Sequence, residues 1–280
     1  MKMLLRIAAF AILLALGRNA VAQNIEAPLP DIRQLMAEVQ KHQRELDQVR
    51  ESYTYTTLQT IQDIDSSGRV KKTTTEEHEA FFVHGHVIER VVKRNGQPLS
   101  GHDMDKETER VTKLVEKAEK TPTGQPLEGP SITVSRILEL MEVRNPRREL
   151  YRGRHAIVFD FVGRKDVKTH GMAEDASKKL AGTMWIDEAD RQVAHLDVHF
   201  TDDFRVAAGL FASIQKGSSF HFDQSPVEDG LWLPTGGEGN VQARVLLVKG
   251  IRQHVVERDY DYKRFRVETQ AGHTAQPAKK

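Results

Sequence analysis

Three ionisable side chains stand at alternate positions of one segment: His195, Asp197 and His199. Residues two apart in a strand point to the same face, so two imidazoles and a carboxylate would lie in one line. Both groups are metal ligands, and a metal-dependent hydrolase is therefore one hypothesis for this strand. The polar face of an exposed strand would show the same alternation, and we favour that interpretation. We expect no metal, no cofactor and no catalytic residue.

Three other features invite a chemical interpretation. Asp259 and Asp261 are spaced like a pair of catalytic carboxylates, but we interpret them as solvated acids flanking tyrosines. Glycines at 236, 237 and 239 suggest a hairpin loop rather than a phosphate cradle, and Trp185 and Trp232 suggest core aromatics. The sequence contains no G-x-S-x-G, H-E-x-x-H or Walker motif.

The composition excludes several classes of protein. The 280 residues include 41 Lys and Arg against 40 Asp and Glu, which lacks the basic excess of a dedicated nucleic-acid binder. The absence of cysteine excludes zinc ribbons, iron-sulfur clusters, thiol catalysis and disulfides. With 39% hydrophobic and 29% charged residues, the chain has the composition of a folding protein with a sizeable core.

The N-terminus has the pattern of a cleavable export signal. Lys2 and Arg6 precede the apolar run 7–16, and small residues follow up to Ala22. An apolar core of about ten residues is too short to span a bilayer as a helix. We expect residues 1–22 to be a signal peptide, the mature chain to begin at Gln23, and the protein to be periplasmic.

The remaining sequence predicts three helices and many strands. The segment after Asp31 has apolar residues at helical spacing to Val49, a charged helix should begin after Ser100 and end near Ala118, and a short helix should occupy 131–141. We expect strands at 53–64, 70–83, 87–93, 148–151, 155–162, 182–187, 192–201, 218–224, 240–248 and 251–262. Their short links predict one long, curved antiparallel sheet. Residues 163–180 should form a mobile loop.

The predicted sheet has one apolar face. Side chains alternate between apolar and polar in two strands, and those on the apolar side are Ile157, Phe159, Phe161, Ala194, Leu196, Val198 and Phe200. The helices could fill the concavity over this face, or the concavity could hold an apolar ligand. Periodicity alone leaves both alternatives open.

Several segments together resemble a known family. They are Gly182–Asp187, Lys216–Ser218, Val227–Thr235 and Tyr260–Phe265. Over residues 143–268 the chain resembles exported bacterial proteins related to the LolA/LolB superfamily, the outer membrane lipoprotein-sorting proteins. The resemblance implies an α+β fold, in which an open half-barrel of antiparallel strands carries helices on its concave face. The helices after Asp31, Ser100 and Ser131 would form its lid.

The resemblance also implies a function. We expect residues 23–268 to form a single domain with an inserted charged helix at about 100–120, and residues 269–280 to be a disordered tail. The domain would be a non-enzymatic periplasmic carrier or binding protein for lipid or lipoprotein acyl chains, held in a cavity lined by the seven apolar residues named above. Membrane-bound donor and acceptor proteins would be its partners, and nucleic acid would not. One alternative is an envelope-stress sensor or regulatory module that binds a membrane protein; the other is the metal-dependent hydrolase built on His195, Asp197 and His199.

Overall fold

The computed structural model describes residues 28–123, 125, 127, 134–206, 212–227, 230–245 and 249–264. The predicted signal peptide, the cleavage site before Gln23 and the predicted tail lie outside these ranges. Among the described residues, no helix is long and apolar enough to cross a membrane.

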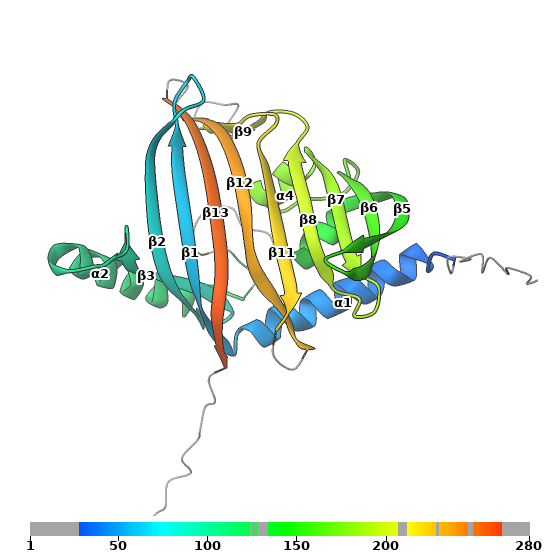
Figure 1. Cartoon of the computed structure of the whole chain (residues 1–280), viewed down its shortest axis with the longest axis horizontal. Coiled ribbons are helices and arrows are strands. Elements are labelled where there is room, and N and C mark those ends of the chain that lie inside the picture. The colour runs from blue at the N-terminus through cyan, green and yellow to red at the C-terminus, as the bar shows by residue number, and fades with distance from the viewer. Residues whose placement is uncertain are drawn as a thin grey trace, which may run out of the picture.

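One antiparallel sheet of 13 strands forms the body of the protein and curves without closing (Figure 1). Its order is β4-β3-β2-β1-β13-β12-β11-β8-β7-β6-β5, with β10 pairing with β12 and β9. The first long strand, β1, therefore pairs with the last, β13. The strands are β1 Tyr53–Ile64, β2 Val70–Val83, β3 His86–Arg94, β4 Gln97–Pro98, β5 Met141–Tyr151, β6 Arg154–Gly163, β7 Leu180–Asp187, β8 Val193–Phe200, β9 Phe204–Val206, β10 Ala212–Ile214, β11 Ser219–Pro226, β12 Trp232–Val245 and β13 Lys249–Arg264. The predicted curved α+β fold is confirmed.

Two helices cover the apolar part of the concave face. The helix α1, Ile32–Arg50, begins at Asp31, whose Oδ1 accepts a hydrogen bond from the Gln34 backbone N–H at 2.9 Å. Its apolar stripe packs beside α3, Val134–Leu140, onto β6, β7 and β8. The main hydrophobic core lies between these layers and consists of Leu35, Met36, Val39, Ile137, Leu138, Met141, Ile157, Phe159, Phe161, Leu180, Met184, Ile186, Val193, Leu196, Val198 and Phe200.

The charged helix α2, Gly101–Ala118, does not belong to the lid, and that prediction is wrong. Its Leu114 and Ala118 pack with Ile88 of β3. Ile88 pairs with Phe81, and side chains alternate along a strand, so this contact lies on the face opposite to Ala80 and Glu89. Figure 1 shows α2 beside β3, at the end of the sheet away from α3. The weak apolar stripe of α2 covers the edge of the sheet instead of the concavity.

Two further predictions differ from the structure. The glycines at 236, 237 and 239 lie inside β12 rather than in a hairpin loop. A Cβ atom at Gly236 would lie 2.2 Å from the Glu257 carbonyl oxygen, so the close approach of β13 requires glycine at this position. The predicted loop 163–180 contains the short helix α4, Met172–Ser177, which Arg136 of α3 holds through two hydrogen bonds to Glu174.

Candidate functional site

Strand register places one residue from each of eight strands in a single row across the concave face. From β2 to β6 the paired residues run Glu76, Gln59, Glu257, Gly237, Phe222, Leu196, Met184 and Phe159. The row is polar at one end and apolar at the other. Leu196, Met184 and Phe159 lie under the helices in the main core, whereas Phe222 is half-buried at its margin.

A second row, two residues further along each strand, is apolar over most of its length. It runs Thr74, Ile61, Val255, Gly239, Phe220, Val198, Gly182 and Phe161. Ile61 and Val255 are half-buried and belong to none of the hydrophobic clusters formed by described residues. The apolar face therefore continues beyond the core that α1 and α3 cover.

The middle of each row is a glycine, Gly237 or Gly239, so no side chain projects from β12 at these two positions. A Cβ atom built on Gly239 would meet, among the described residues, only the Ser219 carbonyl oxygen at 3.7 Å and the Phe220 Cβ at 3.9 Å. We call the six residues at this place, Ile61, Val255, Gly237, Gly239, Phe220 and Phe222, the inner strip. It is an apolar surface between the packed core on one side and a polar surface on the other.

The polar surface consists of four acidic residues, Glu76, Glu89, Glu257 and Asp259, which we call the acid wall. Gln59 Nε2 donates to Glu257 Oε2 at 3.3 Å, and Thr57 Oγ1 donates to Asp259 Oδ1 at 2.7 Å. Burial, aided by the charges of Asp259 and Glu89, raises the pKa of Glu257 to about 7. Burial also raises the pKa of Asp259. These acids are half-buried, so the interpretation of Asp259 as a solvated acid is wrong.

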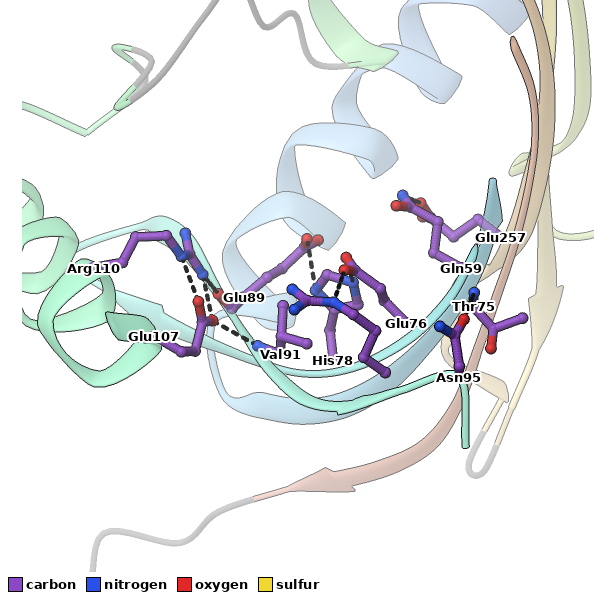
Figure 2. Close-up of polar contacts among 11 residues, drawn as sticks. Gln59, Thr75, Glu76, His78, Glu89, Val91, Asn95, Glu107, Arg110 and Glu257 are labelled. Carbon is purple, nitrogen blue, oxygen red and sulfur yellow. Dashed lines mark hydrogen bonds and ion pairs between the residues drawn. The ribbon is translucent and has the colours of Figure 1, made fainter. Parts of the chain in front are cut away.

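A histidine stands within the acid wall. His78 is 8% exposed, and Figure 2 shows it between Glu76 and Glu89, with Gln59 and Glu257 further along the curve of the sheet. Its Nε2 lies 3.6 Å from Glu76 Oε2 and its Nδ1 lies 3.8 Å from Glu89 Oε2. Both distances exceed that of a hydrogen bond, and neither ring nitrogen has a hydrogen-bond partner among the described residues.

The opposite, outer face carries the residues considered for metal binding. His195 is half-buried there, with its Nδ1 2.8 Å from Asp223 Oδ1 and its ring stacked on Tyr151 at 5.3 Å between centroids. Burial lowers the pKa of His195, but the hydrogen bond and charge of Asp223 outweigh it and place the pKa above its ordinary value. His199 and Asp197 are exposed. The interpretation of this face as solvated holds for these two residues and is wrong for His195.

The outer cluster borders a groove but does not form a metal site. Arg152, His221, Asp223, Gly236 and Arg258 are among the residues that line the groove, whose volume is about 560 Å³. No group of three or more His, Cys, Asp or Glu residues in the described part of the chain is arranged to hold a metal ion. Asp223 instead accepts hydrogen bonds from His195 and from the Tyr151 hydroxyl, the latter at 2.9 Å.

The seven residues predicted to line a cavity are all buried beneath the helices. Six belong to the main core, and Ala194 belongs to a second cluster with Leu46, Trp232 and Leu233. The inner strip and the acid wall were not predicted. The alternation in 53–64 and 251–262 marks those strands, but only the pairing of β1 with β13 shows which of their residues face the concavity beside Phe222.

No family model and no curated protein matches the sequence. Several solved structures are similar. A domain described as an outer membrane lipoprotein-sorting protein, from Vibrio parahaemolyticus, is 10% identical with a TM-score of 0.36, over 85% of this chain and 95% of that one. A DUF1329 family protein from Desulfovibrio piger is 11% identical with a TM-score of 0.35, over 82% and 92% of the two chains. The complex of MucA and MucB from Pseudomonas aeruginosa contains a chain that is 10% identical with a TM-score of 0.23, over 80% and 94%.

Proposed function

We propose that this protein is a non-enzymatic binding protein that holds the acyl chain of a lipid or lipoprotein on its inner strip. The observation that carries the proposal is the continuation of the apolar concave face past α1 and α3, through Phe220 and Gly239 to Val255 and Ile61. A half-buried apolar surface bordered by polar groups suits an amphiphile, whose tail needs cover from water and whose head does not.

The size of the hydrophobic contribution fits reversible binding. Each buried methylene contributes about 0.8 kcal/mol, so a sixteen-carbon tail with half of its surface covered would contribute roughly 6 kcal/mol. That free energy corresponds to a dissociation constant of tens of micromolar before the cost of ordering the tail. Movement of α1 and α3 off the seven core residues would add apolar contact and tighten binding. A carrier also needs to release its cargo, and weak binding favours transfer to a partner with a deeper cavity.

The proposal includes the location and the partners. The export signal predicted for residues 1–22 would deliver the protein to the periplasm, where acyl chains of lipids and lipoproteins need a carrier between membranes. Membrane-bound donor and acceptor proteins would then be its partners. No residue is assigned a catalytic role.

A leucine at Gly239 tests the proposal. The space above Gly239 accepts a Cβ at ordinary contact distances, so Gly239→Leu should fold normally and fill the inner strip. We expect the uncharged dye N-phenylnaphthylamine to gain fluorescence with the parent protein and to lose at least three-quarters of that gain with Gly239→Leu. Mass spectrometry of an organic extract of the parent should detect bound lipid.

The matched control places the same side chain on the other face. Asn240 is exposed and next in sequence, so its side chain points to the outer face, and Asn240→Leu should bind the dye like the parent. Equal dye binding by both variants, or no dye binding by a parent protein freed of lipid by refolding, would contradict the proposal.

A further inference from the structure

We infer that the acid wall is a recognition site for a cationic N–H donor, such as a primary ammonium headgroup, with His78 and Glu89 as its acceptors. This inference rests on the proposed function, because it assigns the chemistry of the head to an amphiphile whose tail lies on the inner strip. The observation behind it is the position of His78.

The surroundings of His78 are unfavourable without a further donor. A neutral imidazole carries one N–H and one lone pair, so whichever tautomer forms, one ring nitrogen directs a lone pair toward a carboxylate. If Nε2 carries the proton, the lone pair of Nδ1 faces Glu89 Oε2 at 3.8 Å, and both atoms are hydrogen-bond acceptors with no donor between them. A buried polar atom without a hydrogen bond is costly, and such atoms are normally satisfied. A donor that contacts both Nδ1 and Oε2 would satisfy both atoms.

The other neighbours leave Glu89 as the accessible partner. Arg94 Nε donates to Glu76 Oε1 at 2.8 Å, and Arg110 binds Glu107, so these two carboxylates already have cationic partners. Glu107 also accepts from the Val91 backbone N–H at 2.7 Å. The Glu89 side chain is 44% exposed, and His78 is its only ion-pair partner among the described residues. A ligand can therefore reach Glu89 from solvent and meet His78 behind it.

The distance to the inner strip suits an amphiphile. His78 pairs with Thr57 on β1, and Ile61 of the inner strip lies four residues further along β1, or about 13 Å at 3.3 Å per residue. Asp259 and Glu257 lie on β13, opposite Thr57 and Gln59. Burial raises the pKa of both carboxyls, and the positive charge of Arg50 opposes that rise at Asp259. A cationic head at His78 and Glu89 would leave its tail directed along β1 and β13 toward Ile61 and Val255.

Three dodecyl compounds with different heads test the inference on the mature protein. Dodecylammonium, dodecanol and dodecanoate would compete at pH 7 with N-phenylnaphthylamine, each below its micelle concentration. We expect dodecylammonium to bind about tenfold more tightly than dodecanol, since a charge-assisted hydrogen bond contributes roughly this factor, and dodecanoate to bind most weakly. Glu89→Gln should reduce the tenfold ratio to below threefold while dodecanol binds as before.

Glu79→Gln is the matched control, because Glu79 follows His78 on the opposite face and pairs with Arg90 there. It should keep the tenfold ratio. Equal binding of dodecylammonium and dodecanol by the parent would overturn the inference and leave the acyl-chain proposal standing, whereas failure of all three compounds to bind would overturn the proposal itself. Nitrogen-15 NMR gives an independent check, since a doubly protonated His78 in the ligand-free protein at pH 7 would satisfy both carboxylates and also overturn the inference.

Discussion

Gln59 of β1 and Glu257 of β13 lie opposite each other on the concave face, with Gln59 Nε2 3.3 Å from Glu257 Oε2. Two strands separated by almost the whole described chain thus place a neutral donor beside a half-buried acid. Burial and the neighbouring charges of Asp259 and Glu89 raise the pKa of Glu257 to about 7, against about 4.5 in the unfolded chain. The folded protein therefore binds this proton more tightly than the unfolded chain does.

This pKa predicts a pH-dependent effect of Glu257→Gln. The stability associated with protonated Glu257 is fully present below pH 4.5 and is lost as the pH rises through 7. Glutamine removes the buried charge, so the variant should be more stable than the parent at pH 8, by roughly 1 to 3 kcal/mol, and about equal to it at pH 5. Urea unfolding at the two pH values measures this. A variant less stable than the parent at pH 8 would show that Glu257 is ionised and well paired.

On the outer face, His195 predicts a pH dependence of the same direction, with a destabilising substitution. Its pKa is raised, so the stability from its contact with Asp223 is fully present below pH 6.5 and is lost as the pH rises through the folded pKa. We expect His195→Gln to destabilise the protein by about 1 to 3 kcal/mol at pH 5.5 and by less at pH 9. His199→Gln, on the same face but exposed, should change stability by less than about 0.5 kcal/mol at either pH. Equal effects of the two substitutions would show that the contact with Asp223 contributes nothing.

Shortening a side chain should affect stability more in the main hydrophobic core than in the inner strip. Leu196 is 1% exposed in the core beneath the helices, so Leu196→Ala should leave a cavity and cost about 2 to 5 kcal/mol. Phe222, its neighbour in the same row, is half-buried, so Phe222→Leu should cost less than about 1.5 kcal/mol and weaken dye binding. Thermal unfolding and dye titration separate the two effects. A mild Leu196→Ala that also alters dye uptake would mean that the cavity opens beneath the helices.

Two glycines of the second row predict contrasting alanine variants. A Cβ atom at Gly182 would lie 1.8 Å from the Asp197 carbonyl oxygen and 2.7 Å from Phe161 Cζ, so Gly182→Ala should destabilise the protein by more than about 2 kcal/mol. Gly239→Ala meets only ordinary contacts and should be neutral or stabilising, because alanine loses less backbone entropy on folding. Equal midpoints in urea for the two variants would contradict the packing described for this row.

Periodicity predicted the elements but not their partners. The stripe of Leu35 and Val39 predicted a helix on the sheet, and the alternation in 192–201 predicted which side of β8 is apolar; both are confirmed. The acid wall depends on the pairing of β1 with β13, and no local pattern in either segment specifies a partner about 200 residues away. A β-bulge between Tyr260 and Lys263 also interrupts the alternation of β13, so residue spacing alone does not predict on which side Asp261 and Tyr262 lie relative to Asp259. Asp261 there has a φ of +57°.

The most direct test of acyl-chain binding on the inner strip uses the absence of cysteine from the chain. Single variants Val255→Cys and Val256→Cys would place an acrylodan label on the concave and the outer face of β13, one residue apart. Titration with uncharged dodecanol should shift the emission at position 255 to shorter wavelength and leave position 256 unchanged. No shift at position 255, or an equal shift at both positions, would contradict binding on the inner strip.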